Sequence, residues 1–542
     1  MSLSSILNIA NSALNAADAG LSVTSNNIAN ANTTGYDRQD VVLSISSPVN
    51  TGNGYMGTGV TVGGIENSSN QFIQAQLLDQ EQTAGKSNAM NQTLSTVEQV
   101  FNEAQNLGLS TSLTQYINDW NDVASDPTSQ TPRTVLLQDA GTLVSTAQDM
   151  ENSILQTLNQ TNSEIDNDVN QINTLASQIA TLNGQIAQVG AGNIDTQASD
   201  LTDQRDQLMS QLSNLVGNAS YQDQNGTLTV TIGQMNLLSG TSTNTLSATQ
   251  DQNGNTQLTL DNTNITSQVN SGQIGGLLAA GSEIQSNSLF GLRKLIASIT
   301  QQTNLLQESG YGLDESTNNN FFNPLQLSTV NNSASANITA SITNLSQVTL
   351  DEYTIGFAGG NYTVTDNQTG AVAATGAYIS GNAINFDGIQ ITITGAVTAA
   401  DSFTVSPLTD AIKNFGVAIT DPNEVAAAST LAALPGDNTN ALQIAQESST
   451  AAIANLGNST FSEYYAGLVS GIGSLSQNAS DSSTFDQNLL TQIQNQQSSV
   501  SGVSLDEESA NLVKYQQAYE AASQIIEVTE QLLQTLNDLT LT

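Results

Sequence analysis

The sequence contains no cysteine and no histidine. Disulfide bonds, cysteine nucleophiles, histidine-based triads and metal sites built from either residue are therefore excluded. Lysine and arginine together number 8, against 48 aspartates and glutamates, so the net charge is −40 at pH 7. A chain with so few cations cannot neutralise a series of phosphates, and we expect neither nucleic acid nor anionic lipid as a partner.

Long hydrophobic runs are also missing. No stretch approaches the roughly 18 consecutive apolar residues of a membrane span, so no membrane insertion is expected. Residues 1–20 contain no lysine or arginine and no continuous apolar block, which is unlike an ordinary secretory signal peptide. Apolar residues nevertheless make up 38% of the 542 residues, which is enough for several packed cores. The chemistry still open to the chain is limited to carboxylates, serine–lysine pairs and oxygen-bound calcium.

The two ends of the chain share a period of three and a half residues. At each end, apolar residues recur at alternating steps of three and four, as at the contact positions of a coiled coil. This pattern predicts one amphipathic helix at each end and a seam along which the helices pack. The predicted assembly seam consists of Leu3, Leu7, Leu14, Leu21, Ile28, Leu512, Tyr515, Tyr519, Ile526, Leu533 and Leu536.

Small residues interrupt this seam and weaken it. Five of its positions bury little apolar area, namely Ala10, Ala17, Thr24, Ala522 and Thr529. Isolated helices of this kind are marginal in water. Two hypotheses follow: the ends are poorly ordered in the free chain and pair on assembly, or they form an intramolecular pair that closes the molecule.

The middle of the chain is mostly helical in pattern. We expect helical pieces across residues 60–125, with Phe72 on a core face, and one long helix from about residue 135 to 189. The predicted apolar stripe of this long helix consists of Ile154, Leu158, Ile165, Val169, Ile172, Leu175, Ile179, Leu182, Ile186 and Val189. About fifty helical residues span roughly 75 Å, which suits an elongated rod better than a globular enzyme. Further helices are expected at residues 198–216, 272–308 and 460–500.

A short region within the rod changes to the period of two that is typical of strands. Residues 221–268 alternate in this way, and the turn sequence Asp-Gln-Asn-Gly occurs at 223–226 and again at 251–254. Asn-Gly favours a hairpin because both central residues of the turn need positive φ. A calcium loop is the alternative, but the full ligand pattern and the distal glutamate of an EF-hand are missing.

A second β-rich region follows further along the chain. Residues 336–407 contain many short alternating runs separated by glycine and asparagine, which predicts a separate all-β module. We expect residues 318–335, which include Phe321 and Phe322, to form a linker. After Pro407 the pattern returns to helix, with Asn440 as a plausible helix cap.

Arg205 is one of the few cations, and it has acidic neighbours at Asp203 and Asp206. One interpretation is a catalytic or ligand-binding arginine. The other is a structural ion pair that orients the helix, and we favour it because charges with acidic neighbours are often structural.

Four segments resemble proteins of the bacterial flagellar axis. Residues 25–36 (SNNIANANTTGY) resemble the N-terminal signature of flagellar rod, hook and hook-associated proteins. Residues 201–208 (LTDQRDQL), 435–442 (PGDNTNAL) and the end of the chain from residue 501 resemble the hook-associated protein 1 family of hook–filament junction proteins. Hook and rod relatives share the first segment but lack the two internal ones.

This resemblance implies a structural and not an enzymatic function. It implies a protein of the junction between hook and filament, which assembles with copies of itself into a helical ring or tube through its terminal helices, without a cofactor. The implied partners are hook protein, hook-associated protein 3 and a cytoplasmic export chaperone at the C-terminal helix. The implied location is the extracellular flagellum, reached by the flagellar type III export pathway.

Three alternatives stay open at this point. The chain could be a hook or rod axial protein, or a secreted carboxylate-dependent glycoside hydrolase, although a single tryptophan and 4% aromatic residues are a poor supply for stacking sugars. A β-rich surface adhesin is the third, and it has no need for paired ends.

The expected fold is mainly α with inserted β: an elongated multi-domain axial protein with paired terminal coiled-coil helices, a helical rod and an all-β outer module. The expected domains are residues 1–45 with 500–542 for the terminal coiled coil, 46–320 with 411–499 for the rod, and 325–410 for the outer module.

Overall fold

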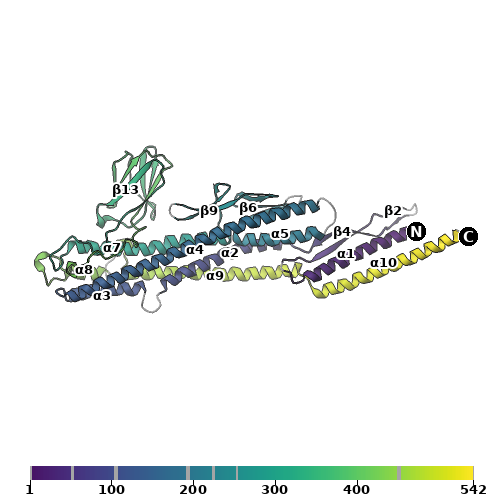
Figure 1. The fold of residues 1–542 in the computed structure, drawn as a ribbon, viewed down its shortest axis with the longest axis horizontal. Coiled ribbons are helices and arrows are strands. Elements are labelled where there is room, and N and C mark those ends of the chain that lie inside the picture. Colours follow the sequence, from purple (N-terminus) through teal and green to yellow (C-terminus); the bar gives the residue numbers. More distant parts are fainter. Residues whose placement is uncertain are drawn as a thin grey trace.

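The structure is a computed structural model that describes residues 3–33, 35–50, 54–102, 108–190, 196–222, 226–251, 254–447 and 453–540. The molecule is long and narrow, both chain ends lie at one tip, and a β-rich module projects from the side near the other tip (Figure 1). The predicted fold class, mainly helical and elongated with paired ends and an inserted β module, is confirmed.

The terminal region consists of two helices and a hairpin. Helix α1 (Leu3–Asn30) lies beside α10 (Leu505–Thr540) at the tip that holds both chain ends (Figure 1). The antiparallel strands β1 (Gln39–Ile45) and β4 (Val60–Asn67) pack against α1 and continue into the short strands β2 (Val49–Asn50) and β3 (Tyr55–Met56).

The sequence analysis missed this hairpin, and the expectation of helix from residue 60 is wrong there. In β4, half-buried and exposed residues mostly alternate and none is fully buried, so the strand carries little of the apolar signal that identifies buried strands. Phe72, expected on a core face, is 69% exposed, whereas its neighbour Ile73 is buried.

The rod is a bundle of long helices (Figure 1). Its main helices are α2 (Gln71–Phe101), α3 (Leu109–Ser125), α4 (Gln130–Gly190), α5 (Thr196–Leu215), α6 (Gly272–Glu283), α7 (Phe290–Ser309), α8 (Thr439–Glu447) and α9 (Phe461–Ser501), with a π-helical turn at Ile284–Leu289 between α6 and α7. Helix α4 has 61 residues, about 90 Å of helix, and is longer than expected.

The predicted apolar stripe of α4 explains why this helix forms the centre of the bundle. Nine of the ten predicted stripe residues are buried: Ile154, Leu158, Ile165, Val169, Ile172, Leu175, Ile179, Leu182 and Ile186. The stripe first contributes to the core shared with α3, α7 and α9, and then to a second core shared with α5, α6 and the small sheets. One helix thus connects two separate hydrophobic cores.

An aromatic cluster anchors the end of the rod that is distant from the chain termini. Phe321 and Phe322, expected in a linker, are both 0% exposed. The Phe321 ring lies 5.3 Å from that of Trp120, and the Phe322 ring lies 4.6 Å from that of Phe415, measured between centroids. The interpretation as a linker is therefore wrong, because asparagines around two apolar residues conceal a core contact.

Asparagine side chains, of which Asn183 and Asn304 are fully buried and Asn173 is half-buried, hold the rod to the segments around it. Asn173 and Asn183 of α4 and Asn304 of α7 each use both ends of the amide on one backbone residue, donating to its carbonyl and accepting from its N–H at 2.8–3.0 Å. Their backbone partners are Leu246, Leu228 and Phe322. An amide satisfies two buried backbone groups without adding a charge, which suits a chain with only 10% charged residues.

Two small antiparallel sheets pack on α4 and α5. Their strands are β5 (Ala219–Gln222), β6 (Leu228–Ile232), β7 (Met235–Ser239), β8 (Ser242–Thr243), β9 (Leu246–Gln250), β10 (Thr256–Leu260) and β11 (Thr263–Asn264). Strand β6 confirms the predicted strand, but burial along it does not alternate strictly, because Thr229 is buried beside Leu228 and Val230. Most of the first expected turn and the centre of the second, residues 223–225 and 252–253, lie outside the described residues, while Gly226 and Gly254 have positive φ of 79° and 80°.

The outer module is all-β, as predicted, and is fixed to the rod. Its strands are β12 (Ser328–Asn331), β13 (Ala336–Ile342), β14 (Tyr353–Ala358), β15 (Asn361–Asp366), β16 (Val372–Ala377), β17 (Ala383–Phe386), β18 (Ile389–Gly395) and β19 (Ser402–Ser406), in sheets ordered β12-β19-β14-β15-β16 and β13-β18-β17. Lys294 of α7 forms an ion pair with Asp351 at 2.9 Å, and Gln301 donates to the carbonyls of Leu345 and Val348.

The segment after Pro407 differs from the expectation. Turns and short 3-10 helices fill residues 408–438, and the next α-helix begins at Thr439. Asn440 is therefore inside α8 and is not its cap. It is 2% exposed, and its side chain donates to the carbonyls of Leu306 and Ala426, so it holds α8 against α7.

None of the helices in the described ranges is long and apolar enough to cross a bilayer.

Asp168 is a carboxyl buried in the rod, and folding changes its pKa. Asp168 of α4 is 5% exposed; one of its oxygens accepts from Gln273 at 3.4 Å, and the other has no partner within the described residues. Burial, and then the charge of Glu164, raise the pKa of Asp168 from 3.8 to about 7. A carboxyl whose pKa is raised by folding binds its proton more tightly in the folded state, so its contribution to stability is lost as the pH rises.

We therefore expect the rod to unfold at a lower temperature at pH 7.5 than at pH 5, because the window from 3.8 to about 7 lies mostly between these values. Asp168→Asn should flatten this dependence, whereas Asp166→Asn, two residues away and exposed, should not. Thermal unfolding followed by circular dichroism measures the effect. If the unfolding temperatures of the two variants change equally with pH, Asp168 is not the responsible group.

Candidate assembly interface

The α1–α10 pair is close because its contact residues are small. Ala10, Ala17 and Thr24 of α1 and Ala522 and Thr529 of α10 are each no more than 3% exposed. Gly20 lies directly against the ring of Tyr515, and a Cβ atom at this position would come within 2.5 Å of that ring. The structure forms this pair within one chain, as in the second hypothesis for the chain ends.

Every bulky residue of the predicted seam keeps part of its surface in solvent, including Tyr515, whose ring packs on Gly20. The half-buried members are Leu3, Leu7, Leu14, Leu21, Ile28, Leu512, Tyr515 and Ile526. The remaining three are exposed, namely Tyr519 at 38%, Leu533 at 39% and Leu536 at 53%. The two helices are thus brought together along the predicted seam, but the small residues are buried and the large ones stay partly in solvent.

A second apolar row on α10, which shares Leu536 with the predicted seam, faces solvent, and we call it the outer stripe. It consists of Ile525, Val528, Leu532, Leu536 and Leu539, which are between 47% and 69% exposed. Their spacing of three or four residues places them along one side of the helix. A contiguous exposed apolar row of this length usually marks a surface that another protein covers.

The hairpin beside α1 carries further exposed apolar residues near its tip. Ile45 is 89% exposed, Tyr55 is 76% exposed and Val49 is 55% exposed. The sequence analysis did not identify these residues. Val49 and Tyr55 lie in two-residue strands on either side of residues 51–53, which are outside the described part of the chain. The composition around them gives no periodic signal.

The signature at residues 25–36 has a structural explanation. Asn27 is 1% exposed; its side chain accepts from the N–H of Gln39 at 3.0 Å and donates to the Gln39 carbonyl at 2.9 Å. The Tyr36 hydroxyl also donates to Asn27, at 2.8 Å. Gly35 has a φ of +78°, which allows the chain to reverse after α1. The motif therefore fixes the start of β1 to the end of α1.

The terminal helices meet the rod at a compact joint. The joint comprises residues 35–39, residues 67–70, the first half of α5, and residues 500–508 between α9 and α10. The N–H of Arg38 donates to the Ser501 carbonyl at 2.8 Å, and the Ser68 N–H donates to the Arg38 carbonyl at 2.7 Å. The Arg38 side chain lies 3.4 Å from both Glu507 and Asp40.

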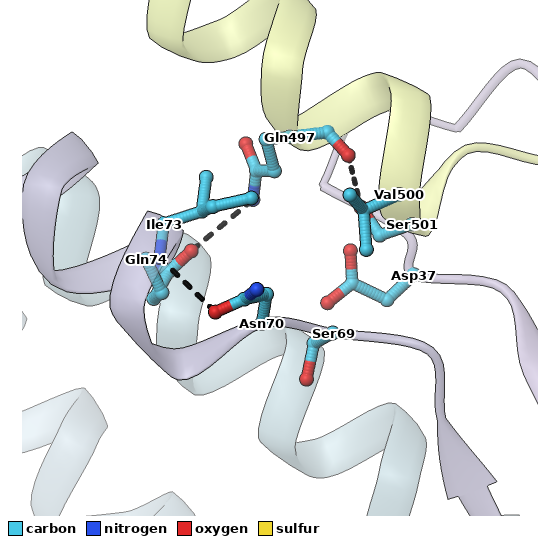
Figure 2. Close-up of a pocket in the computed structure, with 8 residues that line it drawn as sticks. All are labelled: Asp37, Ser69, Asn70, Ile73, Gln74, Gln497, Val500 and Ser501. Atoms are coloured by element: carbon cyan, nitrogen blue, oxygen red, sulfur yellow. Dashed lines mark hydrogen bonds between the residues drawn. The ribbon is translucent and has the colours of Figure 1, made fainter.

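A small pocket opens on one side of the joint. Figure 2 shows Asp37 beside the space between the end of α9 and the start of α2, with Gln497 donating to Gln74 at 3.1 Å across it. The lining contains one carboxyl group. The pocket is therefore a gap between packed elements, with little chemistry of its own.

Arg205 has a structural role, which agrees with the favoured interpretation. It is 3% exposed, and its guanidinium donates to the Gly226 carbonyl at 2.7 Å and to Asn183 at 3.3 Å. The contact with Asp206 is longer, at 3.9 Å. Asp203 is turned instead toward the joint, where it accepts hydrogen bonds from the Asp37 N–H and from Asn67. The arginine thus ties α5 to α4 through hydrogen bonds more than through an ion pair.

Four family models match the chain. The model described as the flagellar hook-associated protein FlgK helical domain matches residues 94–322, and that described as the flagellar hook-associated protein 1 D2-like domain matches residues 327–407. The two ends match models shared with rod proteins: the flagella basal body rod protein at residues 7–36, and the flagellar basal body rod FlgEFG protein C-terminal at residues 494–539.

Curated relatives match nearly the whole length. Flagellar hook-associated protein 1 of Escherichia coli (strain K12) is 30% identical over 98% of this chain and 99% of its own. The protein of the same name from Salmonella typhimurium is 31% identical over the same shares. The chain therefore belongs to the flagellar hook-associated protein 1 family.

One solved structure shows the same fold. The flagellar hook junction protein FlgK from Burkholderia pseudomallei aligns with a TM-score of 0.68 and 20% identity, and it covers 79% of this chain and 100% of its own.

The role of the buried asparagine in the signature can be tested directly. Asn27→Ala leaves the N–H and carbonyl of Gln39 without their buried partner, which costs roughly 1–3 kcal/mol. Amide hydrogen exchange at Gln39 should therefore accelerate by roughly 5- to 150-fold. Asn11→Ala, at an exposed asparagine of the same helix, is the matched control. If the amide of Gln39 exchanges at the same rate in both variants, Asn27 does not fix the start of β1 to the end of α1.

Proposed function

We propose that this protein is a structural subunit of the bacterial flagellum that forms the junction between hook and filament. Its copies assemble side by side through the terminal helices into a helical ring or tube. The observation that carries this proposal is the outer stripe of α10, an apolar row that the chain itself leaves exposed at the tip where both its ends lie. Family membership over nearly the full length supports the same role.

The charge of the chain favours contacts of this apolar kind. Copies with a net charge of −40 repel one another, so their association needs a surface on which burial of apolar area outweighs the repulsion. The outer stripe and the tip of the hairpin are two such exposed apolar surfaces. A head-to-tail contact whose rotation does not close on itself produces a helical tube.

We propose as partners the hook protein on one side and hook-associated protein 3 on the other, with a cytoplasmic export chaperone on α10 before assembly. The corresponding location is the extracellular flagellum, after export by the flagellar type III pathway. These finer assignments follow from the family resemblance. The exposed apolar surface of α10 supports the chaperone assignment, because such a surface needs a cover before assembly.

The alternative functions are less well supported. A hook or rod axial protein shares the matches at the two ends, but the matches at residues 94–322 and 327–407 are to hook-associated proteins. A glycoside hydrolase needs two carboxyls that face one cleft. The buried carboxyls of the described residues lie instead at contacts between elements of the rod and the joint; they are Glu81, Asp119, Glu151, Asp168, Asp203 and Glu508.

We also propose the division into three domains: the terminal coiled coil of residues 1–45 and 500–542, the rod of residues 46–320 and 411–499, and the outer module of residues 325–410. The separate hydrophobic core of the outer module supports its boundary.

A substitution in the outer stripe tests whether this surface mediates assembly. Leu532→Asp places a charge where a neighbouring copy would bury a leucine, a burial of roughly 1.5–3 kcal/mol. We expect the variant to fold and to restore filament growth on hooks that lack a junction at least about tenfold less efficiently than the unaltered protein.

Gln531→Asp is the matched control, because it adds the same charge to the adjacent, exposed and polar position. It should support filament growth normally. If Leu532→Asp performs as well as Gln531→Asp, the outer stripe is not the assembly surface.

A further inference from the structure

Asp203 of α5 is one of several groups that hold the joint between the terminal helices and the rod. Others are Asp200, which accepts from the Gln39 side chain at 2.7 Å, and the Ser501 carbonyl, which accepts from the Arg38 N–H at 2.8 Å. The Asp37 N–H donates to one oxygen of Asp203 at 3.2 Å, and the side chain of Asn67, at the end of β4, donates to the other. Both strands of the hairpin are therefore attached to the rod through this residue, one through the chain just before β1 and the other through the last residue of β4.

This carboxyl is buried among other acids. Asp203 is 7% exposed, and Asp37, Asp200 and Asp206 surround it. On the other elements of the joint, Glu507 and Glu508 of α10 and Asp40 of β1 add further negative charge, and Tyr36 lies near Asp200, Asp203 and Glu508.

The two arginines nearby do not compensate for this charge. The guanidinium of Arg38 forms its ion pairs with Asp40 and Glu507, and that of Arg205 bonds Asn183 and the Gly226 carbonyl. No ion pair to Asp203 occurs within the described residues. A negative charge at this position is therefore buried and repelled, which favours the neutral acid.

Each oxygen of Asp203 accepts one hydrogen bond, from the Asp37 N–H and from the Asn67 side chain. Burial first, and then the charges of Asp37, Asp206 and Asp200, raise the pKa of Asp203 to about 8, against the opposing effect of the Asp37 N–H bond.

We propose that the joint is a proton-operated latch: a neutral Asp203 holds the base of the hairpin and the terminal helices at a fixed angle to the rod, and loss of its proton releases them. The released state relieves the repulsion among Asp37, Asp200, Asp203 and Asp206 by admitting water. If the protein builds a tube through its terminal helices, the latch also controls the geometry of that tube, and this consequence rests on the proposed function.

The latch can be tested on the free full-length chain, which separates its failure from a failure of the proposed function. Because the chain contains no cysteine, Asp18→Cys on α1 and Gln92→Cys on α2, both at exposed positions, allow clean attachment of two spin labels. Double electron–electron resonance then measures the distance distribution between terminal helices and rod at about pH 6 and about pH 9.5. We expect one narrow distribution at the lower pH and a broad one at the higher pH.

Two variants test whether Asp203 is the group whose ionisation releases the terminal helices. Asp203→Asn cannot ionise, and its amide oxygen still accepts from the Asp37 N–H, so the distance distribution of this variant should stay narrow at both pH values. Asp168→Asn changes a buried carboxyl in the rod away from the joint. The distance distribution of this variant should therefore broaden at the higher pH, as that of the unaltered chain does. The unaltered chain alone can overturn the proposal, by keeping a narrow distribution at the higher pH. The proposal would also be overturned if the distance distribution of Asp203→Asn broadened at the higher pH, or if that of Asp168→Asn stayed narrow there.

Discussion

The structure depends on the contact between α1 and α10, in which small residues let two helices approach closely. Alanine, threonine and glycine fill the interface, and Gly20 lies against the ring of Tyr515. This contact places the two chain ends at one tip and leaves several bulky side chains of α10, those of the outer stripe, exposed. Because the pair buries little apolar area of its own, it is suited to gain stability from neighbouring copies.

The low content of lysine and arginine has a counterpart in the packing. Where other proteins use ion pairs, this chain uses asparagine amides that bond both groups of one backbone residue, as Asn27, Asn173, Asn183 and Asn304 do. Several carboxyls are then buried without a cation, and folding raises the pKa of Asp119 to about 6, that of Asp168 to about 7 and that of Asp203 to about 8. Both features follow from a sequence that supplies many amides and acids and few bases.

Much of the fold could be predicted from the sequence, because long periodic stripes determine long helices. The stripe of α4 and the seams of α1 and α10 are of this kind, and so are the alternating strands of the outer module. The hairpin of residues 39–67 could not be predicted, because its half-exposed strands give a weak pattern. Phe321 and Phe322 were missed for a similar reason, since their asparagine-rich surroundings are typical of a loop. The joint brings together four distant segments, and no local pattern indicates that Asp203 meets Asp37 and Asn67.

The central claim is that the outer stripe of α10 is exposed in the free chain and covered by neighbouring copies after assembly. Amide hydrogen exchange of α10, compared between free protein and protein assembled on hooks, tests it most directly. The account predicts that residues 525–539 become strongly protected on assembly while the buried centre of α4 is unchanged. Equal protection of residues 525–539 in the two states would contradict it.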